Sequence, residues 1–281
     1  MKRGFKAALL LCCVFILICA NSGNVYAGEP ENITKNGVTI AGLPSDEADG
    51  MVRISGKTDK DDIKILLTKD DKREWYDVSL KNGAFDEDIW LTEGKGSYRL
   101  DVMVHEYDRK YSYGPGLTVE NATGANRFKV PGKYIESGDD GIIKLAGQLT
   151  EGLNTDREKA KAIYDWVKDN MEYDYKKLES QRQNDYDNEY GAVNALKTGK
   201  GVCFDYAALT AALGRAAGLE TKLVEGEVDS DGATGYHAWN EFYISDEGKW
   251  INADATLAST TGKDYFDNNA ANNIYNISQQ I

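Results

Sequence analysis

Histidine, cysteine and proline are scarce in this sequence, whose 281 residues include two, four and four of them. The two histidines, His105 and His237, are far apart, so no His-x-x-x-His pair is available to bind a transition metal. The sequence also lacks a Walker-type glycine loop for phosphates. We therefore expect neither a metal ion nor a cofactor.

Positive charge is also limited. The chain has 33 lysines and arginines against 46 aspartates and glutamates, which gives a formal net charge of −13. Nucleic acids and anionic lipid surfaces attract proteins with basic patches. The balance of charge therefore argues against a nucleic-acid partner and is typical of a soluble secreted protein.

The longest apolar run, residues 7–20, is too short for a membrane-spanning helix, which needs roughly 20 residues. It follows a basic stretch at residues 2–6 and precedes a typical signal-peptidase site at residues 25–27. These features predict that residues 1–27 are a signal peptide. The mature protein would then have no stable membrane span and would be secreted, either extracellular or at the cell surface. An uncleaved N-terminal anchor is the alternative.

Cleavage of this segment would leave a single cysteine. Cys12, Cys13 and Cys19 would be removed, so Cys203 would have no partner for an intramolecular disulfide. A lone thiol in an oxidising compartment is a liability, and its presence indicates either deep burial or a use for the thiol. Composition alone favours burial, because free cysteine is among the most buried residue types.

The N-terminal half of the mature chain reads as short strands separated by turns. Strands are expected over residues 52–56, 63–67, 75–80, 98–105 and 117–120, and Asn82-Gly83 is a strong hairpin signal. About seven strands at this spacing indicate a small all-β sandwich, which we place at residues 28–125. Segments such as Asn82-Gly83-Ala84-Phe85 resemble the immunoglobulin-like modules of bacterial surface and secreted proteins.

A polar connection over residues 121–133 precedes a region with helical periodicity. Residues 155–158 form a capping box, and apolar residues then repeat at the spacing of an amphipathic helix over residues 156–170. Residues 173–188 are polar and rich in tyrosine, so we expect a loop or lid there. Residues 192–197 predict a short helix.

Cys203 stands at the beginning of an almost wholly apolar helix that we expect to end at Gly218. A helix of this composition belongs in the core of its domain. The unpaired N–H groups and partial positive charge at its N-terminus favour a thiolate, and the same N–H groups suit an oxyanion. The position of Cys203 therefore favours a nucleophile over a structural thiol.

His237 lies in a strand expected over residues 236–244, and Asp254 ends a second strand that begins at residue 249. If a hairpin closes on the turn at residues 245–248, His237 and Asp254 become diagonal neighbours on one face, roughly 7–8 Å apart. A slip of one residue would place them on opposite faces. The register predicts the cross-strand pairs Ile244–Lys249, Trp239–Asp254 and His237–Thr256.

Three blocks of this region resemble the transglutaminase-like superfamily. They are Gly201-Val202-Cys203-Phe204-Asp205-Tyr206-Ala207, His237-Ala238-Trp239-Asn240-Glu241 and Trp250-Ile251-Asn252-Ala253-Asp254-Ala255-Thr256. Upstream, residues 162–167 and 173–175 resemble the helix and loop that precede the nucleophile in that family. One departure is Ala255, where the family often has proline.

The resemblance implies an α+β fold with a papain-like core of helices packed on an antiparallel sheet, in a catalytic domain at residues 131–281. It implies a catalytic triad in which Cys203 is the nucleophile, His237 the general base and acid, and Asp254 the residue that orients His237. The family's second oxyanion donor cannot be placed by matching. The candidates for it are Tyr175, Gln183 and Asn194.

Such a triad attacks a carbonyl carbon and forms a thioester. Resolution by water makes the enzyme a hydrolase, such as a cysteine protease or amidase, whereas resolution by a lysine amine makes it an acyltransferase, a cross-linking transglutaminase. We expect a secreted thiol enzyme that acts on a protein or peptide partner at or near the cell surface or cell wall. The alternative is a catalytically silent binding or scaffold protein with the same fold. The choice between hydrolysis and transfer stays open at this stage.

Overall fold

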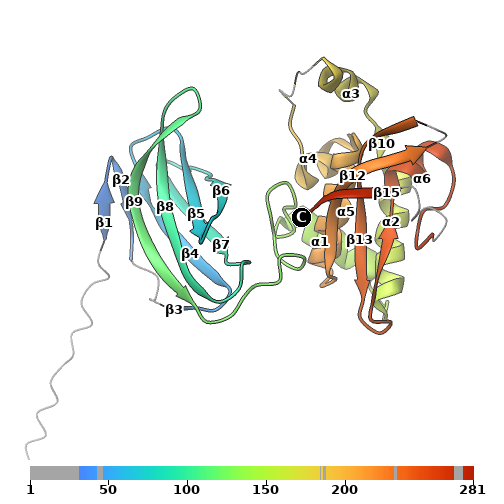
Figure 1. Ribbon diagram of the computed structural model, residues 1–281, viewed down its shortest axis with the longest axis horizontal. Coiled ribbons are helices and arrows are strands. Elements are labelled where there is room, and N and C mark those ends of the chain that lie inside the picture. The colour runs from blue at the N-terminus through green and yellow to red at the C-terminus, as the bar shows by residue number, and fades with distance from the viewer. Residues whose placement is uncertain (1–31, 43–46, 184, 186–187, 231–232, 269–274) are drawn as a thin grey trace, which may run out of the picture.

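The computed structural model describes residues 32–42, 47–183, 185, 188–230, 233–268 and 275–281. The expected signal peptide, residues 1–27, lies outside the described residues. Buried apolar side chains form two clusters, one from residues 38–119 and one from residues 135–258. Figure 1 shows the corresponding all-β part and α+β part joined by the segment that follows residue 121. The fold class is therefore α+β, as predicted.

The all-β part consists of two facing sheets. One sheet has the order β1 (Ile33–Lys35), β2 (Val38–Ile40), β4 (Met51–Thr58) and β7 (Ala84–Trp90). The other has the order β3 (Glu47–Ala48), β9 (Lys110–Asn121), β8 (Gly96–Tyr107), β5 (Ile63–Lys69) and β6 (Lys72–Asp77). Alternate residues such as Val52 and Ile54 are buried while Arg53 is exposed, as expected of a strand with one face on a core. One apolar cluster draws side chains from both sheets, so this part is a sandwich.

The turn at Asn82-Gly83 forms, but the prediction of a hairpin there is wrong, because the strands before and after the turn, β6 and β7, do not pair with each other. Both residues have positive φ values, 53° and 72°. However, β7 pairs with β4, whereas β6 pairs with β5 and ends at Asp77, short of the predicted residue 80. The tight turn at Asp70, with a φ of 54°, closes β6 onto β5. The Asn82-Gly83 turn therefore leads the chain from one sheet to the other.

The α+β part surrounds one helix. Its antiparallel sheet has the order β14 (Lys249–Ala253), β13 (Ala233–Ile244), β12 (Thr221–Ser230) and β15 (Tyr275–Gln280), and β10 (Glu172–Tyr173) pairs in parallel with β11 (Lys200–Gly201). The helices are α1 (Asp140–Thr150), α2 (Asp156–Asn170), α3 (Tyr175–Arg182), α4 (Ala192–Thr198), α5 (Cys203–Ala216) and α6 (Ala255–Thr261). In the described part of the chain, no helix is long and apolar enough to cross a membrane.

Helix α5 is the centre of this part, with the sheet on one side and the other helices around it (Figure 1). It is almost wholly apolar because both its sides are buried. Gly214 lets it approach the sheet closely, since a Cβ there would collide with Thr221 and Phe242. The helix ends as predicted, with Gly218 in the left-handed region at a φ of 84°.

Helices α2 and α3 differ in how clearly the sequence marks them. Helix α2 has the predicted bounds and the predicted capping box between Thr155 and Glu158. Helix α3, in contrast, lies where a loop was expected. Asp174 accepts hydrogen bonds from two backbone N–H groups and so begins α3, but Lys177 is the only buried residue of this polar helix. A helix with one buried residue gives no apolar repeat to detect.

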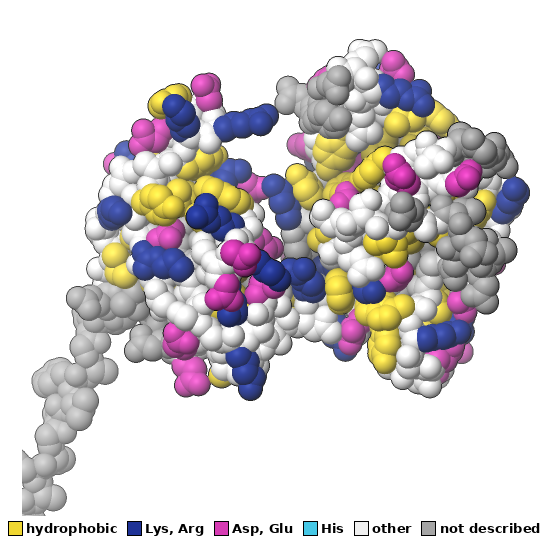
Figure 2. Space-filling view, in the orientation of Figure 1, with side chains coloured by type: hydrophobic (Ala, Val, Ile, Leu, Met, Phe, Trp, Pro, Cys, Tyr) yellow, Lys and Arg dark blue, Asp and Glu magenta, His cyan; other side chains and the backbone are white. Residues whose placement is uncertain are grey.

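Charged side chains cover both parts of the molecule. On the face shown in Figure 2, acidic and basic side chains are interspersed, with apolar side chains between them.

Candidate active site

Cys203 is the first residue of α5 and is 8% exposed. It lies in the wall of a pocket of about 550 Å³ that His237 also lines. The first turn of α5 points its free N–H groups and the positive end of the helix dipole toward this residue. The thiol therefore lies where a negative charge is stabilised and where an external group has access.

His237 connects Cys203 to Asp254. Its Nε2 donates a hydrogen bond to Asp254 Oδ2 at 2.7 Å, and the Asp254 side chain is fully buried. Cys203 and His237 line the same pocket, and the interaction between the thiol and the imidazole contributes to the raised pKa of His237. Because Nε2 is engaged by the carboxylate, Nδ1 is the nitrogen that remains for the sulfur. The three predicted residues thus lie together at one site.

The route that brings Asp254 to His237 differs from the prediction. Strand pairing begins at Ile244–Lys249, as predicted, but it ends at Asn240–Ala253. The predicted pairs Trp239–Asp254 and His237–Thr256 are wrong, because α6 begins immediately after Asp254.

Asp254 leaves the strand because it is the N-cap of α6. Its Oδ1 accepts from the backbone N–H of Leu257 at 2.8 Å, while Oδ2 is left for His237. The start of the helix therefore fixes the direction of the carboxylate. An aspartate at the end of a strand is the sequence signal for this cap.

Two effects compete in setting the protonation of His237. Burial lowers its pKa, but the charge of Asp254 and hydrogen bonds with Asp254 and Cys203 outweigh burial and raise the pKa to about 10. The imidazole is therefore protonated at neutral pH. A positive charge beside a thiol favours the thiolate, which is the nucleophilic form of cysteine.

Aromatic side chains form a large part of the pocket wall. Five rings line it, those of Tyr134, Tyr173, Tyr190, Phe204 and Tyr236. Gln181 and Arg182 add an amide and a guanidinium from α3. The pocket is therefore suited to an amide that has apolar groups on either side.

The three candidates for the second oxyanion donor are not brought to Cys203. Tyr175 is 68% exposed, Gln183 donates to Glu179 at 3.1 Å, and Asn194 donates to the backbone of Glu189 at 2.9 Å. None of the three candidates lines the pocket of Cys203.

Gln181 is the amide side chain from α3 that lines this pocket, and its Nε2 donates to Tyr190 Oη at 3.0 Å. Gln183 follows the last residue of α3, so the helix does not direct its side chain as it directs that of Gln181. The sequence did not distinguish the two glutamines because α3 itself was not predicted.

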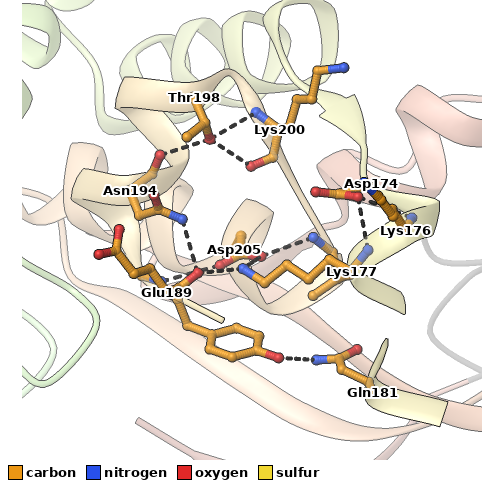
Figure 3. A network of polar contacts seen from close by, with 12 residues as sticks. Asp174, Lys176, Lys177, Gln181, Glu189, Asn194, Thr198, Lys200 and Asp205 are labelled. Atoms are coloured by element: carbon orange, nitrogen blue, oxygen red, sulfur yellow. Dashed lines mark hydrogen bonds and ion pairs between the residues drawn. The ribbon is translucent and has the colours of Figure 1, made fainter. Parts of the chain in front are cut away.

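A buried ion pair missed from the sequence joins α3 to the first turn of α5 (Figure 3). Lys177 Nζ is 2.8 Å from Asp205 Oδ2, and their side chains are 6% and 0% exposed. Asp205 also accepts from the backbone N–H of Val202, at the start of α5, and of Gly191. Gly201 is required here, because a Cβ would collide with the Asp205 side chain.

Lys177 extends this network to the wall of the pocket. Its Nζ donates to the backbone oxygen of Glu189 at 2.6 Å and lies 3.9 Å from the centre of the Tyr190 ring. The ion pair thus ties α3 and Tyr190 to the residues that precede Cys203. A lysine in a polar helix and an aspartate two residues after a cysteine give no sequence signal that they meet.

A cysteine at a helix N-terminus that shares a pocket with a histidine, which is itself hydrogen-bonded to a buried aspartate, defines a candidate thiol site in an α+β domain. Residues 143–255 match the family model described as the transglutaminase-like superfamily. The chain therefore contains a domain of the transglutaminase-like superfamily.

Two curated relatives match part of the chain. The kyphoscoliosis peptidases of Mus musculus and Homo sapiens are 31% and 30% identical to it over 127 residues. The match covers 42% of this chain but only 18% of each relative. The similarity is therefore limited to a small part of those proteins.

Among solved structures, a candidate cysteine protease from Cytophaga hutchinsonii is 16% identical with a TM-score of 0.39, over 89% of this chain and 90% of that one. Red sea bream transglutaminase is 12% identical with a TM-score of 0.25, over 78% of this chain and 50% of that one. Both scores are low, so the function is inferred from the site.

Proposed function

We propose that this protein is a thiol enzyme that cleaves or transfers peptide and protein amides through a thioester. The observation that carries the proposal is that His237, hydrogen-bonded to a fully buried Asp254, lines the same pocket as Cys203 and interacts with its thiol. The family supports a cysteine hydrolase or acyltransferase. The matched proteins include both a peptidase and a transglutaminase, so their names favour neither hydrolysis nor acyl transfer.

In the first half-reaction, the Cys203 thiolate attacks the carbonyl carbon of the amide, and the carbonyl oxygen becomes an oxyanion. The N–H groups at the start of α5 stabilise this charge. Protonated His237 then gives its proton to the departing nitrogen, so the C–N bond breaks and a thioester remains on Cys203.

In the second half-reaction, water or an amine attacks the thioester carbon and His237 takes a proton from it. The C–S bond breaks, and the thiolate and protonated imidazole are restored. Asp254 stabilises the positive charge of His237 whenever the imidazole is protonated, which is before the first half-reaction and again in the second. Water releases a carboxylic acid and an amine releases a new amide.

The signal-peptide features of residues 1–27 extend the proposal to location. A secreted enzyme would meet its protein or peptide partner outside the cell or at the cell surface. The all-β part would then contact that partner or the wall.

Hydroxylamine distinguishes the two reactions, because it competes with water for a thioester. Incubation of the chain with hydroxylamine and a protein rich in glutamine, such as casein, is expected to give hydroxamate if amines resolve the thioester. Free carboxylate without hydroxamate would indicate hydrolysis. Mass spectrometry of the products detects both, and either product should fall by about 1000-fold or more in Cys203→Ser, the control. Neither product, across a panel of proteins, would favour the silent scaffold.

A further inference from the structure

A tyrosine from the C-terminal strand shares the carboxylate of Asp254 with His237. Tyr275 is the first residue of β15, and its hydroxyl donates to Asp254 Oδ2 at 3.0 Å. The same oxygen accepts from His237 Nε2 at 2.7 Å, while Oδ1 accepts from Leu257. One carboxylate oxygen thus accepts hydrogen bonds from two residues that lie in different strands.

The ring of Tyr275 is fixed by an aromatic stack. It stacks on Trp239 with 4.5 Å between ring centres, and Trp239 lies 6.2 Å from the His237 ring at an interplanar angle of 13°. Trp239 is buried, with 2% exposure. The same indole therefore aligns both side chains that donate to Asp254 Oδ2.

The hydroxyl of Tyr275 stays protonated. Burial raises its pKa, and the charge of Asp254 and the hydrogen bond to it raise it further. Tyr275 is therefore a neutral donor at neutral pH. A neutral donor offsets part of the cost of burying the carboxylate without neutralising it, so Asp254 still attracts the proton on His237.

We propose that Tyr275 is a positioning residue of the candidate triad, which holds Asp254 Oδ2 toward His237. The inference rests on the proposed function, in which Asp254 orients His237. Tyr275 lies outside residues 143–255, the region that matches the family model. Strand β15, which pairs with β12 through Val228 and Tyr275, thus completes a site whose other members lie within that region.

Tyr275→Phe tests the proposal, because it removes the hydroxyl and keeps the ring that stacks on Trp239. The rate of Cys203 alkylation by iodoacetamide is followed against pH in the full chain, by mass spectrometry of the peptide that contains Cys203. We expect a plateau rate about 10-fold lower than in the wild type. We also expect the pH limit, which is the pH at which His237 loses its proton, to rise, because the less shielded carboxylate holds that proton more tightly.

Two comparisons separate positioning from a general loss of stability. Tyr98→Phe removes a buried hydroxyl that donates to Gly94 in the all-β part, at 2.8 Å, and should change neither rate nor pH limit. In an Asp254→Asn background, Tyr275→Phe should have little further effect, because Tyr275 acts through the carboxylate. If Tyr275→Phe lowers the alkylation rate by the same factor in the wild type and in the Asp254→Asn background, the proposal is overturned.

The chain has only two histidines, so ¹⁵N-histidine spectra give a second reading of the same contact. His105→Gln assigns the two signals. In Tyr275→Phe the His237 signal should shift and its Nε2–H should exchange faster with water, whereas Tyr98→Phe should leave it unchanged. An unchanged His237 signal would overturn the role of Tyr275.

Should Tyr275→Phe fail to fold, Tyr275→Trp keeps a ring and a donor and is expected to hold the plateau rate within about 3-fold of wild type. A folded Tyr275→Trp whose rate falls as far as that of Asp254→Asn would count against the proposal.

Failure of the proposed function and failure of the proposed role of Tyr275 give different results. A wild-type Cys203 that reacts like an ordinary thiol contradicts the proposed enzyme, while a fast wild type with an equally fast Tyr275→Phe contradicts only the role of Tyr275.

Discussion

Asp254→Asn is expected to lower turnover by about 1000-fold or more while the protein stays folded. Asparagine caps helices as well as aspartate does, so α6 should still begin at residue 254. What is lost is the negative charge that stabilises protonated His237. The measurement is the rate of hydroxamate or carboxylate formation, with circular dichroism as the check of folding.

Asp264→Asn is the matched control for this substitution. Asp264 lies in the same part of the chain, accepts a hydrogen bond from Tyr164 at 3.0 Å, and is not among the residues that line the Cys203 pocket. Its substitution should change turnover by no more than about 3-fold. A folded Asp254→Asn with activity within about 10-fold of wild type would remove Asp254 from the mechanism.

Lys177→Met should be the most destabilising of these substitutions. It leaves Asp205 as an unpaired charge in a fully buried position, which typically costs about 3–5 kcal/mol in the free energy of unfolding. The same substitution removes the contacts of Lys177 Nζ with the Tyr190 ring and the Glu189 backbone oxygen. Urea unfolding monitored by tryptophan fluorescence measures the change.

An exposed ion pair in the same part of the chain supplies the control. Lys200 Nζ lies 3.0 Å from Glu172, with side chains 52% and 72% exposed. Lys200→Met should cost less than about 1 kcal/mol, because water screens the pair. If Lys177→Met costs no more than Lys200→Met, the Lys177–Asp205 pair does not hold the site together.

The parts of the fold that follow from local pattern were predictable. Helix α2 follows from its capping box and apolar repeat, and the start of α5 from an apolar run after Gly201. The closing turn of the β13–β14 hairpin gave the pair Ile244–Lys249.

What could not be predicted depends on partners far apart in the chain. The exchange of sheets between β6 and β7 is set by which strands bury their apolar faces together, not by the turn itself. Lys177 and Asp205 are charged residues whose burial is favourable only because they meet.

The same limit applies to the candidate site. Cys203, His237 and Asp254 could be named as candidates because a family motif surrounds each of them and a helix or strand pattern places it. Tyr275 could not, because a tyrosine in a polar C-terminal segment has no pattern that relates it to Asp254. The sequence therefore indicated the candidate triad but not the tyrosine that contacts it.

We propose that Cys203 reacts as a thiolate beside a protonated imidazole. At pH 6 an ordinary thiol, with a pKa of about 8.5, is only about 0.3% thiolate. His237 has a pKa raised to about 10, so at pH 6 it is protonated and presents its positive charge to the sulfur. His237 should lose its proton only as the pH rises toward 10.

Iodoacetamide labelling of Cys203 at pH 6 tests this claim most directly, with glutathione as the reference thiol. We predict labelling at least about 10-fold faster than glutathione, with a rate that stays nearly flat between pH 6 and 9 and falls to the reference level in His237→Ala. Labelling of the wild type no faster than glutathione at pH 6, rising tenfold per pH unit, would contradict it.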